Sequence, residues 1–244
     1  MSQPHPLSTP LDDATRALLA GVSTATLATQ LFKRGFRTRF MTGVAPLHPG
    51  LKLVGVARTL RYVPMREDLD QLAVFRDPDM PQRKAVEMVG PGDVMVIDAR
   101  GDVRAGTIGN ILATRVMKRG AAGIVSDGPF RDLEGIRELG FPCYTSGPHA
   151  NTNLSVHHPV DVDVPIGCGG VLVFPGDVLV GDGDGVIVIP RHLAQEVALD
   201  AAEQERAEVF ILEKIEAGAG IVGVYPMSSE TEEEYRRWSE ERSK

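Results

Sequence analysis

Cysteine is scarce in this chain, with Cys143 and Cys168 the two examples among 244 residues. Two cysteines can form neither a disulfide framework nor a four-cysteine zinc site. We therefore expect both to be small, reduced core residues of a cytosolic, cytoplasmic protein. A disulfide between them is the less favoured alternative.

An excess of positive charge is also absent. The chain has 26 Lys and Arg residues against 33 Asp and Glu, which gives a formal net charge of −7. Binding to nucleic-acid phosphates needs a basic face, so we expect no nucleic acid as a main partner. No apolar run approaches the length that crosses a bilayer, and the first ten residues lack the basic and apolar regions of a signal peptide. We therefore expect no membrane partner.

Hydrophobic residues make up 43% of the chain, enough to bury the core of one large domain. We expect a flexible N-terminus over residues 1–10, a single domain over 11–225, and an acidic C-terminal tail over 226–244. Helical spacing is found over 11–20, over 22–33 with Thr24 as a candidate N-cap, and over 192–215, where Gly218 ends a long helix. The tail from Ser228 is a short exposed helix, a partner-docking segment, or a solvated segment without function.

Several segments have the pattern of strands. Residues 51–59 alternate, residues 94–98 are expected to form a strand, and the Asp- and Pro-rich residues 64–82 between them suggest an insertion or lid. Two similar Pro-Gly-Asp-Val segments begin at Pro91 and Pro175, which suggests two similar β units in one sheet system. The Asp-Gly repeats over 181–185 predict a tight hairpin with 186–189 as the return strand.

The chemistry is concentrated between Gly109 and Asp132. Gly109-Asn110 can start a helix, an apolar strand follows over 122–125, and the stretch ends on Arg131-Asp132. This order places a helix N-terminus and an Arg-Asp pair at one end of a strand–helix–strand unit. A helix N-terminus and an arginine both attract a carboxylate, and an aspartate can hold a divalent cation. A 2-oxo acid on Mg²⁺ needs these groups, although the pair could instead be a structural ion pair or a helix N-cap.

Five motifs occur in a specific order between about residues 25 and 220: G-N-I-L-A-T, R-G-A-A-G-I-V-S-D-G, R-D-L, L-G-F-P and G-C-G-G-V-x-V-x-P-G-D-V-L-V-G-D-x-D-G-V-I-V-I-P. Together they resemble the class II pyruvate aldolase family typified by 4-hydroxy-4-methyl-2-oxoglutarate aldolase, whose close relative is the regulator of ribonuclease activity A (RraA). The resemblance implies an α/β fold, a swivelling β/β/α-type RraA-like aldolase domain, here with N-terminal helices and a long C-terminal helix. It also implies a homo-oligomer, a trimer or a hexamer, with active sites between subunits.

The resemblance assigns roles to the matching residues. Arg131 would bind the pyruvyl group and stabilise its enolate, and Asp132 would be the protein ligand of Mg²⁺ or Mn²⁺. The backbone amides of Ile111 and Leu112, next to Gly109, would hold the substrate carboxylate.

Two further positions complete the implied site. Asn110 stands where the family commonly has a carboxylate, and its carbonyl could still orient a metal-bound water. A second carboxylate would come from the C-terminal helix of a neighbouring subunit, at Glu208 or, as the alternative, at Glu205.

Other polar residues in the sequence have structural interpretations as well as functional ones. We expect Asp127 to fix a turn or to support Arg131, and His149 to lie in a loop where it could face the substrate. We expect packing or strand-edge roles for the remaining candidates: Arg115, Arg119, His157, His158 and Cys168.

These patterns favour a metal-dependent carbon–carbon lyase acting on a small 2-oxo acid. Retro-aldol cleavage that releases pyruvate and decarboxylation of oxaloacetate pass through the same pyruvate enolate, whose charge a metal and a guanidinium stabilise. One alternative is a non-catalytic trimeric binding protein that regulates a ribonuclease or another partner. Another is a related lyase or dehydratase on a sugar-derived acid, with residues 64–82 reshaping the pocket.

Overall fold

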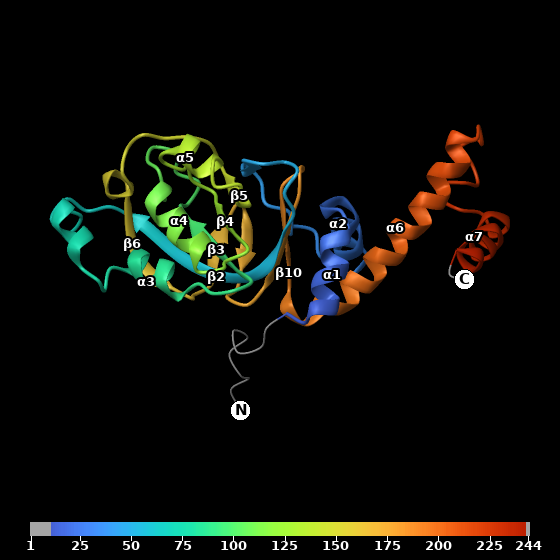
Figure 1. The fold of residues 1–244 in the computed structure, drawn as a ribbon, viewed down its shortest axis with the longest axis horizontal. Helices are drawn as coiled ribbons and strands as arrows, with labels where there is room; N and C mark the ends of the chain where they lie inside the picture. Colours follow the sequence, from blue (N-terminus) through green and yellow to red (C-terminus); the bar gives the residue numbers. More distant parts are fainter. Residues whose placement is uncertain (1–10, 243–244) are drawn as a thin grey trace, which may run out of the picture.

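The computed structural model describes residues 11–242, so the expected flexible segment 1–10 lies outside the described residues (Figure 1). Two helices open the fold, α1 (Asp13–Gly21) and α2 (Thr24–Lys33). The side chain of Ser23 caps α2, because it accepts a hydrogen bond from the amide of Thr26. The prediction of Thr24 as the N-cap is therefore wrong by one residue. The Thr24 amide and hydroxyl both donate to Asp182, at 2.7 and 2.8 Å, and fasten α2 to the sheet.

One mixed sheet forms the centre of the molecule, in the order β1-β5-β4-β3-β2-β9-β10, with β6 also paired to β2. Strands β2 to β5 run parallel to one another, and β9 joins β2 antiparallel. The strands are β1 (Ala45–Pro46), β2 (Leu53–Pro64), β3 (Asp93–Asp98), β4 (Gly123–Ser126), β5 (Cys143–Thr145), β6 (His157–Val162), β9 (Val178–Gly181) and β10 (Val186–Ile189). A small second sheet pairs β7 (Ile166–Cys168) with β8 (Val171–Val173).

The two Pro-Gly-Asp-Val segments form β3 and β9, which lie on opposite sides of β2. This confirms the prediction of two similar β units in one sheet system. The hairpin between β9 and β10 is also confirmed, and its turn is closed by the amide of Asp182, which donates to the carbonyl of Gly185. Every residue of β9 and β10 is buried, so these strands read as continuous apolar runs.

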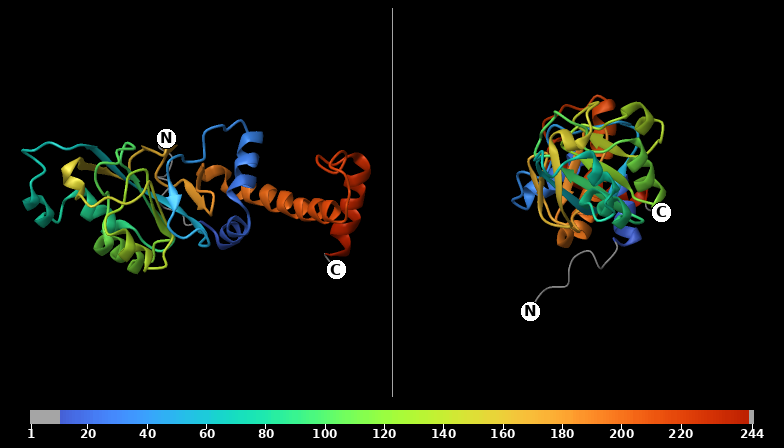
Figure 2. Two further views of the ribbon diagram at one scale, coloured as in Figure 1. Left: turned by 90° about the horizontal axis from the view of Figure 1, so that it is seen from above. Right: turned by 90° about the vertical axis from the view of Figure 1, so that its left-hand side faces the viewer.

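Short helices connect the parallel strands and pack on the sheet (Figures 1 and 2). They are α3 (Pro81–Met88), α4 (Asn110–Lys118) and α5 (Leu133–Arg137). The segment 64–82 contains the 3-10 helix η2 (Leu72–Arg76) and the start of α3, and a second short helix, η3 (Asn153–Ser155), precedes β6. Cys143 and Cys168 are both buried, in two separate core clusters.

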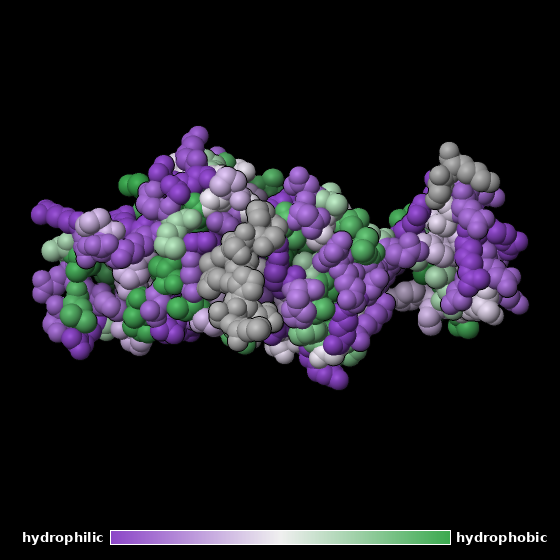
Figure 3. Space-filling model, turned by 90° about the horizontal axis from the view of Figure 1, so that it is seen from below, coloured by the Kyte–Doolittle hydropathy of each residue, from purple (hydrophilic) through white to green (hydrophobic). Residues whose placement is uncertain are grey.

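The long C-terminal helix is present as α6 (Ala194–Glu216), after the short helix η4 (Arg191–Leu193). Its first half packs against α1 and α2, and its second half projects beyond the body (Figures 1 and 2). The acidic segment after Ser228 forms α7 (Ser229–Glu241), which folds back on the end of α6. We call α7 and the projecting half of α6 the C-terminal arm; Figure 3 shows it apart from the body, with a largely hydrophilic surface. Within residues 11–242, no helix is long and apolar enough to cross a membrane.

Candidate active site

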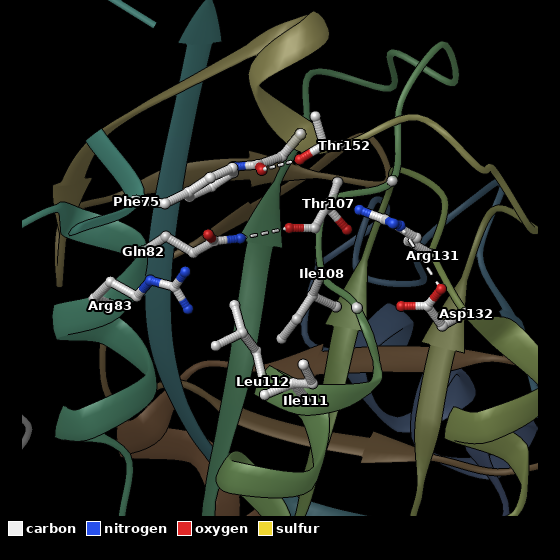
Figure 4. Close-up of a pocket in the computed structure, with 13 residues that line it drawn as sticks. Phe75, Gln82, Arg83, Thr107, Ile108, Ile111, Leu112, Arg131, Asp132 and Thr152 are labelled. Carbon is white, nitrogen blue, oxygen red and sulfur yellow. Dashed lines mark hydrogen bonds and ion pairs between the residues drawn. The ribbon is translucent and has the colours of Figure 1, made fainter. Parts of the chain in front are cut away.

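A cavity of about 290 Å³ lies where the loop before α4 meets the loop after β4 (Figure 4). Its lining comes from four parts of the chain: Phe75, Gln82 and Arg83; Gly106, Thr107, Ile108, Gly109, Ile111 and Leu112; Arg131 and Asp132; Thr152 and Asn153. The helix start and the Arg-Asp pair that the sequence singled out therefore share one cavity.

The first turn of α4 presents backbone donors to this cavity. Gly109 is the N-cap and has no side chain to accept from the helix, and the first bond within the helix runs from the Ala113 amide to the Gly109 carbonyl at 3.0 Å. The first amides of a helix have no acceptor inside it. Together with the positive end of the helix dipole, they favour an anion such as a carboxylate beside Ile111 and Leu112.

Asp132 has an unusual backbone and a carboxylate that does no capping. Its φ and ψ are 57° and 43°, in the left-handed region, and it stands at the N-cap position of α5 without a hydrogen bond from its side chain. Its Oδ1 lies 3.7 Å from Nε of Arg131, and the side chain is half exposed. Left-handed non-glycine residues cluster at functional sites because the surrounding structure must hold them there. The geometry thus argues against the helix-cap interpretation and leaves this carboxylate available.

Arg131 is fixed beside the start of α4 by close backbone packing. Its amide donates to the carbonyl of Ile108 at 2.9 Å. A Cβ on Gly106 would lie 2.8 Å from Cβ of Arg131, so no other residue fits at position 106. The guanidinium is half exposed and faces the cavity (Figure 4).

The opposite wall is held by a buried hydrogen-bond network. Nε2 of Gln82 donates to the Tyr62 hydroxyl and to the Thr107 carbonyl, both at 2.8 Å, and the Tyr62 hydroxyl donates to the same carbonyl at 2.9 Å. Burial raises the pKa of Tyr62, which keeps its hydroxyl protonated as a donor. The network ties α3 to the loop that carries Gly109.

Asn110 and Glu208 lie outside this cavity within the chain. Oδ1 of Asn110 accepts from the Thr114 hydroxyl at 3.2 Å, and its Nδ2 lies 2.7 Å from where a Cβ on Gly135 would stand. The Asn110 side chain therefore packs between α4 and α5. Glu208 is on α6, where it accepts from Nε2 of Gln204 at 2.8 Å.

The remaining candidates also have defined places. Glu205 accepts from the Ser23 amide at 2.9 Å, which is a structural role at the start of α2. Asp127 accepts from the amides of Ala99 and Gly101 at 2.7 and 3.1 Å, so it joins two turns and does not contact Arg131. Burial raises the pKa of this carboxyl.

His149 and the two arginines of the α4 segment have contacts of their own. His149 borders a second hollow, on which Arg131 and Asp132 also lie, and its Nδ1 accepts from the Asn151 amide at 3.1 Å. Arg115 pairs with Glu87, and Arg119 donates to the Val89 carbonyl at 2.7 Å, both structural contacts.

The fit of a divalent cation can be judged from the donors present. Among the described residues there is no group of three His, Cys, Asp or Glu side chains that could hold a metal. Of the residues that the structure describes, Asp132 is the one carboxylate that lines the cavity. A single carboxylate, completed by waters and substrate oxygens, is an arrangement that Mg²⁺ accepts, so the residues fit a loosely held ion.

Among the cavity residues that sequence reasoning missed are Phe75, Gln82 and Arg83. They come from the segment that the sequence suggested as an insertion or lid and from the helix that follows it. Pro81 at the first position of α3 was the available signal, because proline favours the start of a helix.

Comparisons with known proteins agree with this architecture. Residues 24–188 match the model of the RraA-like family, described as Aldolase/RraA. A provisionally named 4-hydroxy-4-methyl-2-oxoglutarate aldolase of Halalkalibacterium halodurans is 35% identical over 174 residues, 70% of this chain and 75% of the relative. A 4-hydroxy-4-methyl-2-oxoglutarate aldolase of Thermus thermophilus is 35% identical over 122 residues, 49% of this chain and 72% of that protein.

Solved structures share the fold. An uncharacterized protein from Pseudomonas syringae pv. tomato superposes with a TM-score of 0.80 at 26% identity, over 93% of this chain and all of that one. RraAS2 of Streptomyces coelicolor, described as an unusual member of the RNase ES inhibitor RraA protein family, superposes with a TM-score of 0.73 at 37% identity, over 83% and 97% of the two chains. This chain belongs to the RraA-like family.

Proposed function

We propose that the protein is a divalent-metal-dependent lyase acting on small 2-oxo acids. The reaction would be retro-aldol cleavage of substrates such as 4-hydroxy-4-methyl-2-oxoglutarate, and decarboxylation of oxaloacetate in the same site. The observation that carries the proposal is the meeting of three features in one cavity: the Arg131 guanidinium, the uncapped Asp132 carboxylate and the free amides of α4. The aldolase names of two relatives support it.

Some residues of the cavity would bind the substrate, and others would stabilise the charge that develops in the reaction. The amides of Ile111 and Leu112 would hold the C1 carboxylate, and Arg131 would donate to the 2-oxo oxygen. When the C3–C4 bond breaks, the C4 hydroxyl would give its proton to a water in the cavity and become a carbonyl, while the electron pair of the broken bond moves toward the 2-oxo oxygen. A guanidinium already aimed at that oxygen stabilises the enolate as it forms. Protonation at C3 then gives pyruvate.

We propose that Asp132 holds Mg²⁺ or Mn²⁺. The ion would supply Lewis-acid stabilisation of the same developing charge. We further propose that the protein assembles as a trimer or hexamer in which Glu208 of a neighbouring subunit approaches the cavity, since the projecting half of α6 carries it away from the body of its own chain. Asn110 would then act mainly by positioning the start of α4.

The test is release of pyruvate from 4-hydroxy-4-methyl-2-oxoglutarate and from oxaloacetate, with Mg²⁺, with Mn²⁺ and with a chelator. We expect Asp132→Asn to lower turnover by about a hundredfold or more, because it removes the one carboxylate of the cavity. Asp184→Asn is the matched control, since Asp184 is exposed in the β9–β10 turn. Metal-independent turnover, or none across a panel of 2-oxo acids, would refute the proposal.

A non-catalytic regulator of a ribonuclease is the second candidate. It is supported by the likeness to RraAS2 and by the asparagine at position 110, which brings no carboxylate to the start of α4. Inhibition of a ribonuclease by both the wild type and Asp132→Asn would favour this function, because binding to a protein partner does not need a metal ligand.

A further inference from the structure

We propose that Arg83 is a specificity-determining residue that binds a second carboxylate, at the end of the substrate opposite Arg131. The inference rests on the proposed function in one respect, since it takes the 2-oxo acid end to lie at Arg131. It assigns to a named residue the recognition of the distal carboxylate that the proposed substrates carry, so that the preference for dicarboxylic over monocarboxylic 2-oxo acids depends on Arg83.

The first observation is placement. Arg83 lines the same cavity as Arg131 but comes from α3, on the other wall. Figure 4 shows its guanidinium directed from α3 into the space above Leu112, with Arg131 across the cavity. The apolar side chains of Ile108 and Leu112 lie between the two arginines. A ligand that spans the cavity therefore meets a cation at each end and an apolar surface between them.

The second observation concerns the acids near Arg83, a residue that also borders a neighbouring hollow lined by Asp77, Asp79 and Glu87. In the part of the chain that the structure describes, none of the three pairs with Arg83, and Asp77 accepts from the Asp79 amide at 2.8 Å. On α3 and the turn before it, Asp79 pairs with Lys84 at 3.0 Å, and Glu87 pairs with Arg115 at 2.8 Å and with Arg119 at 3.1 Å. Within residues 11–242 Arg83 forms no ion pair, and its guanidinium lies over the ring of Phe75, with 5.5 Å between the guanidinium carbon and the ring centroid. A guanidinium that lines a cavity without a carboxylate partner is suited to bind one in a ligand.

The third observation is that Arg83 is held in place before any ligand arrives. Its neighbour Gln82 is 2% exposed and bonds to Tyr62 and to the Thr107 carbonyl. The amide of Arg83 donates to the Met80 carbonyl at 2.9 Å, and Phe75 packs on the guanidinium. Preorganisation lowers the entropy lost on binding, so the position can discriminate between ligands.

Discrimination follows from the chemistry of the distal end of the ligand. A distal carboxylate gains a charge-assisted hydrogen bond from Arg83. A methyl group at the same point would displace water from the guanidinium without replacing its hydrogen bonds, which costs binding energy. Because Arg83 touches the ligand far from the bond that breaks, it sets substrate choice more than the rate of the chemical step.

The test compares two ligands that differ only at this end, 2-oxoglutarate and 2-oxopentanoate. Both have five carbons and the same 2-oxo acid head, and neither has the C4 hydroxyl that retro-aldol cleavage needs. Their dissociation constants are measured by titration calorimetry in Mg²⁺ for the wild type, Arg83→Gln, Arg83→Lys and Lys84→Gln. Lys84 is the matched control, since it carries the same charge on the same helix but is exposed and paired with Asp79.

We expect the wild type and Lys84→Gln to bind 2-oxoglutarate about ten- to a hundredfold more tightly than 2-oxopentanoate. Arg83→Gln should abolish this preference while its affinity for 2-oxopentanoate stays within about threefold, and Arg83→Lys should retain part of it. The inference is overturned by an absent preference in the wild type, by failure to bind either acid, or by equal losses for both ligands in Arg83→Gln.

This readout separates the inference from the proposed function because binding needs no turnover. A wild type that prefers 2-oxoglutarate through Arg83 but releases no pyruvate from any substrate would refute the lyase and leave the carboxylate site standing. If the wild type and Arg83→Gln cleave 4-hydroxy-4-methyl-2-oxoglutarate equally well and the wild type shows no ligand preference, the carboxylate site is refuted and the lyase proposal stands.

Discussion

Gly109 and Asp132 are so close that a Cβ on the glycine would lie 3.0 Å from Oδ2 of the aspartate. The first is the N-cap of α4 and the second the N-cap of α5, and neither provides a side-chain cap to its helix. The first amides of α4 and Asp132, among residues 11–242 the one carboxylate that lines the cavity, are therefore positioned by a direct contact between two helix starts.

This contact predicts the effect of Gly109→Ala. The backbone of Gly109, with φ of −113° and ψ of 174°, accepts alanine without strain, but alanine is a poorer N-cap than glycine, so the free energy of unfolding should fall by about 1 kcal/mol. The new methyl group must push aside the half-exposed Asp132 carboxylate, so we expect pyruvate formation to fall about tenfold or more. Gly21→Ala is the control, because a Cβ there meets open space. Unchanged kinetics in Gly109→Ala would show that the Asp132 position is not critical.

The Gln82 network predicts a coupled loss of stability. Gln82→Leu leaves the Thr107 carbonyl with the Tyr62 hydroxyl alone, and Tyr62→Phe leaves it with Gln82 alone. Each change should cost about 1–3 kcal/mol, because it removes buried hydrogen bonds. In urea unfolding, the free energy of unfolding of the double variant should fall by more than the sum of the two single losses. The double variant removes both of the side-chain donors, Tyr62 and Gln82, from the Thr107 carbonyl. Strict additivity would show that the two donors act independently.

The central strands could be predicted from the sequence because their signal is local. Buried apolar runs bounded by Pro-Gly-Asp and Asp-Gly turns specify β3, β9 and β10 without reference to the rest of the chain. The adjacency of Arg131 to the start of α4 was also predictable, since a strand–helix–strand unit brings the two loops to one edge of the sheet.

Arg83 and the direction of Asn110 could not be predicted, because both depend on contacts between distant segments. Arg83 lies at the cavity because its neighbour Gln82 bonds to the carbonyl of Thr107, 25 residues away in the sequence. The Asn110 side chain occupies the space that the absent side chain of Gly135 leaves on α5. This helix has five residues and is too short to give a periodic signal in the sequence. The resemblance to a family specified residue identities at the site but not these side-chain orientations.

The Asn110 side chain provides a prediction that tests its assigned role. Because it packs against Thr114 and α5 and does not line the cavity, Asn110→Ala should lower the free energy of unfolding by about 1 kcal/mol. Pyruvate formation should fall by less than about tenfold, far less than in Asp132→Asn. A loss as large as that of Asp132→Asn, in a stably folded variant, would instead indicate that Asn110 contacts substrate or a catalytic water.

His157 predicts a loss of stability in acid. It is fully buried and stacks on Tyr62, with ring centroids 5.2 Å apart. Burial, followed by the nearby Arg100 cation, lowers the pKa of His157 to about 4 from 6.5. The folded state therefore favours the neutral ring. This contribution to stability is complete above about pH 6.5 and is lost as the pH falls toward 4.

The corresponding variant is His157→Phe, which keeps an aromatic ring on Tyr62 but cannot bind a proton. Between pH 7 and pH 4 the wild type should lose roughly 2–3 kcal/mol more than this variant, measured from urea unfolding at each pH. His192→Gln removes an exposed histidine and should follow the wild-type profile. Parallel profiles for the wild type and His157→Phe would exclude His157 as a source of the acid sensitivity.

A small aromatic cluster holds α7 to the projecting half of α6, which predicts that α7 can be detached from α6 without loss of stability in the body. Trp238 lies 5.6 Å from Phe210 between ring centroids and donates to Glu213 at 2.9 Å, and its ring is covered by Arg242. Since α7 is highly charged, this contact supplies much of the apolar area that holds it to α6.

Trp238→Ala should speed cleavage within α7 by a glutamate-specific protease about tenfold or more, while the unfolding transition of the body stays within about 2 °C. Arg237→Ala, which keeps every glutamate and an exposed position on α7, should be cleaved at the wild-type rate. A lower unfolding temperature of the body in Trp238→Ala would mean that the arm and the body unfold as one cooperative unit. If they unfolded independently, losing a contact within the arm would leave the unfolding temperature of the body unchanged.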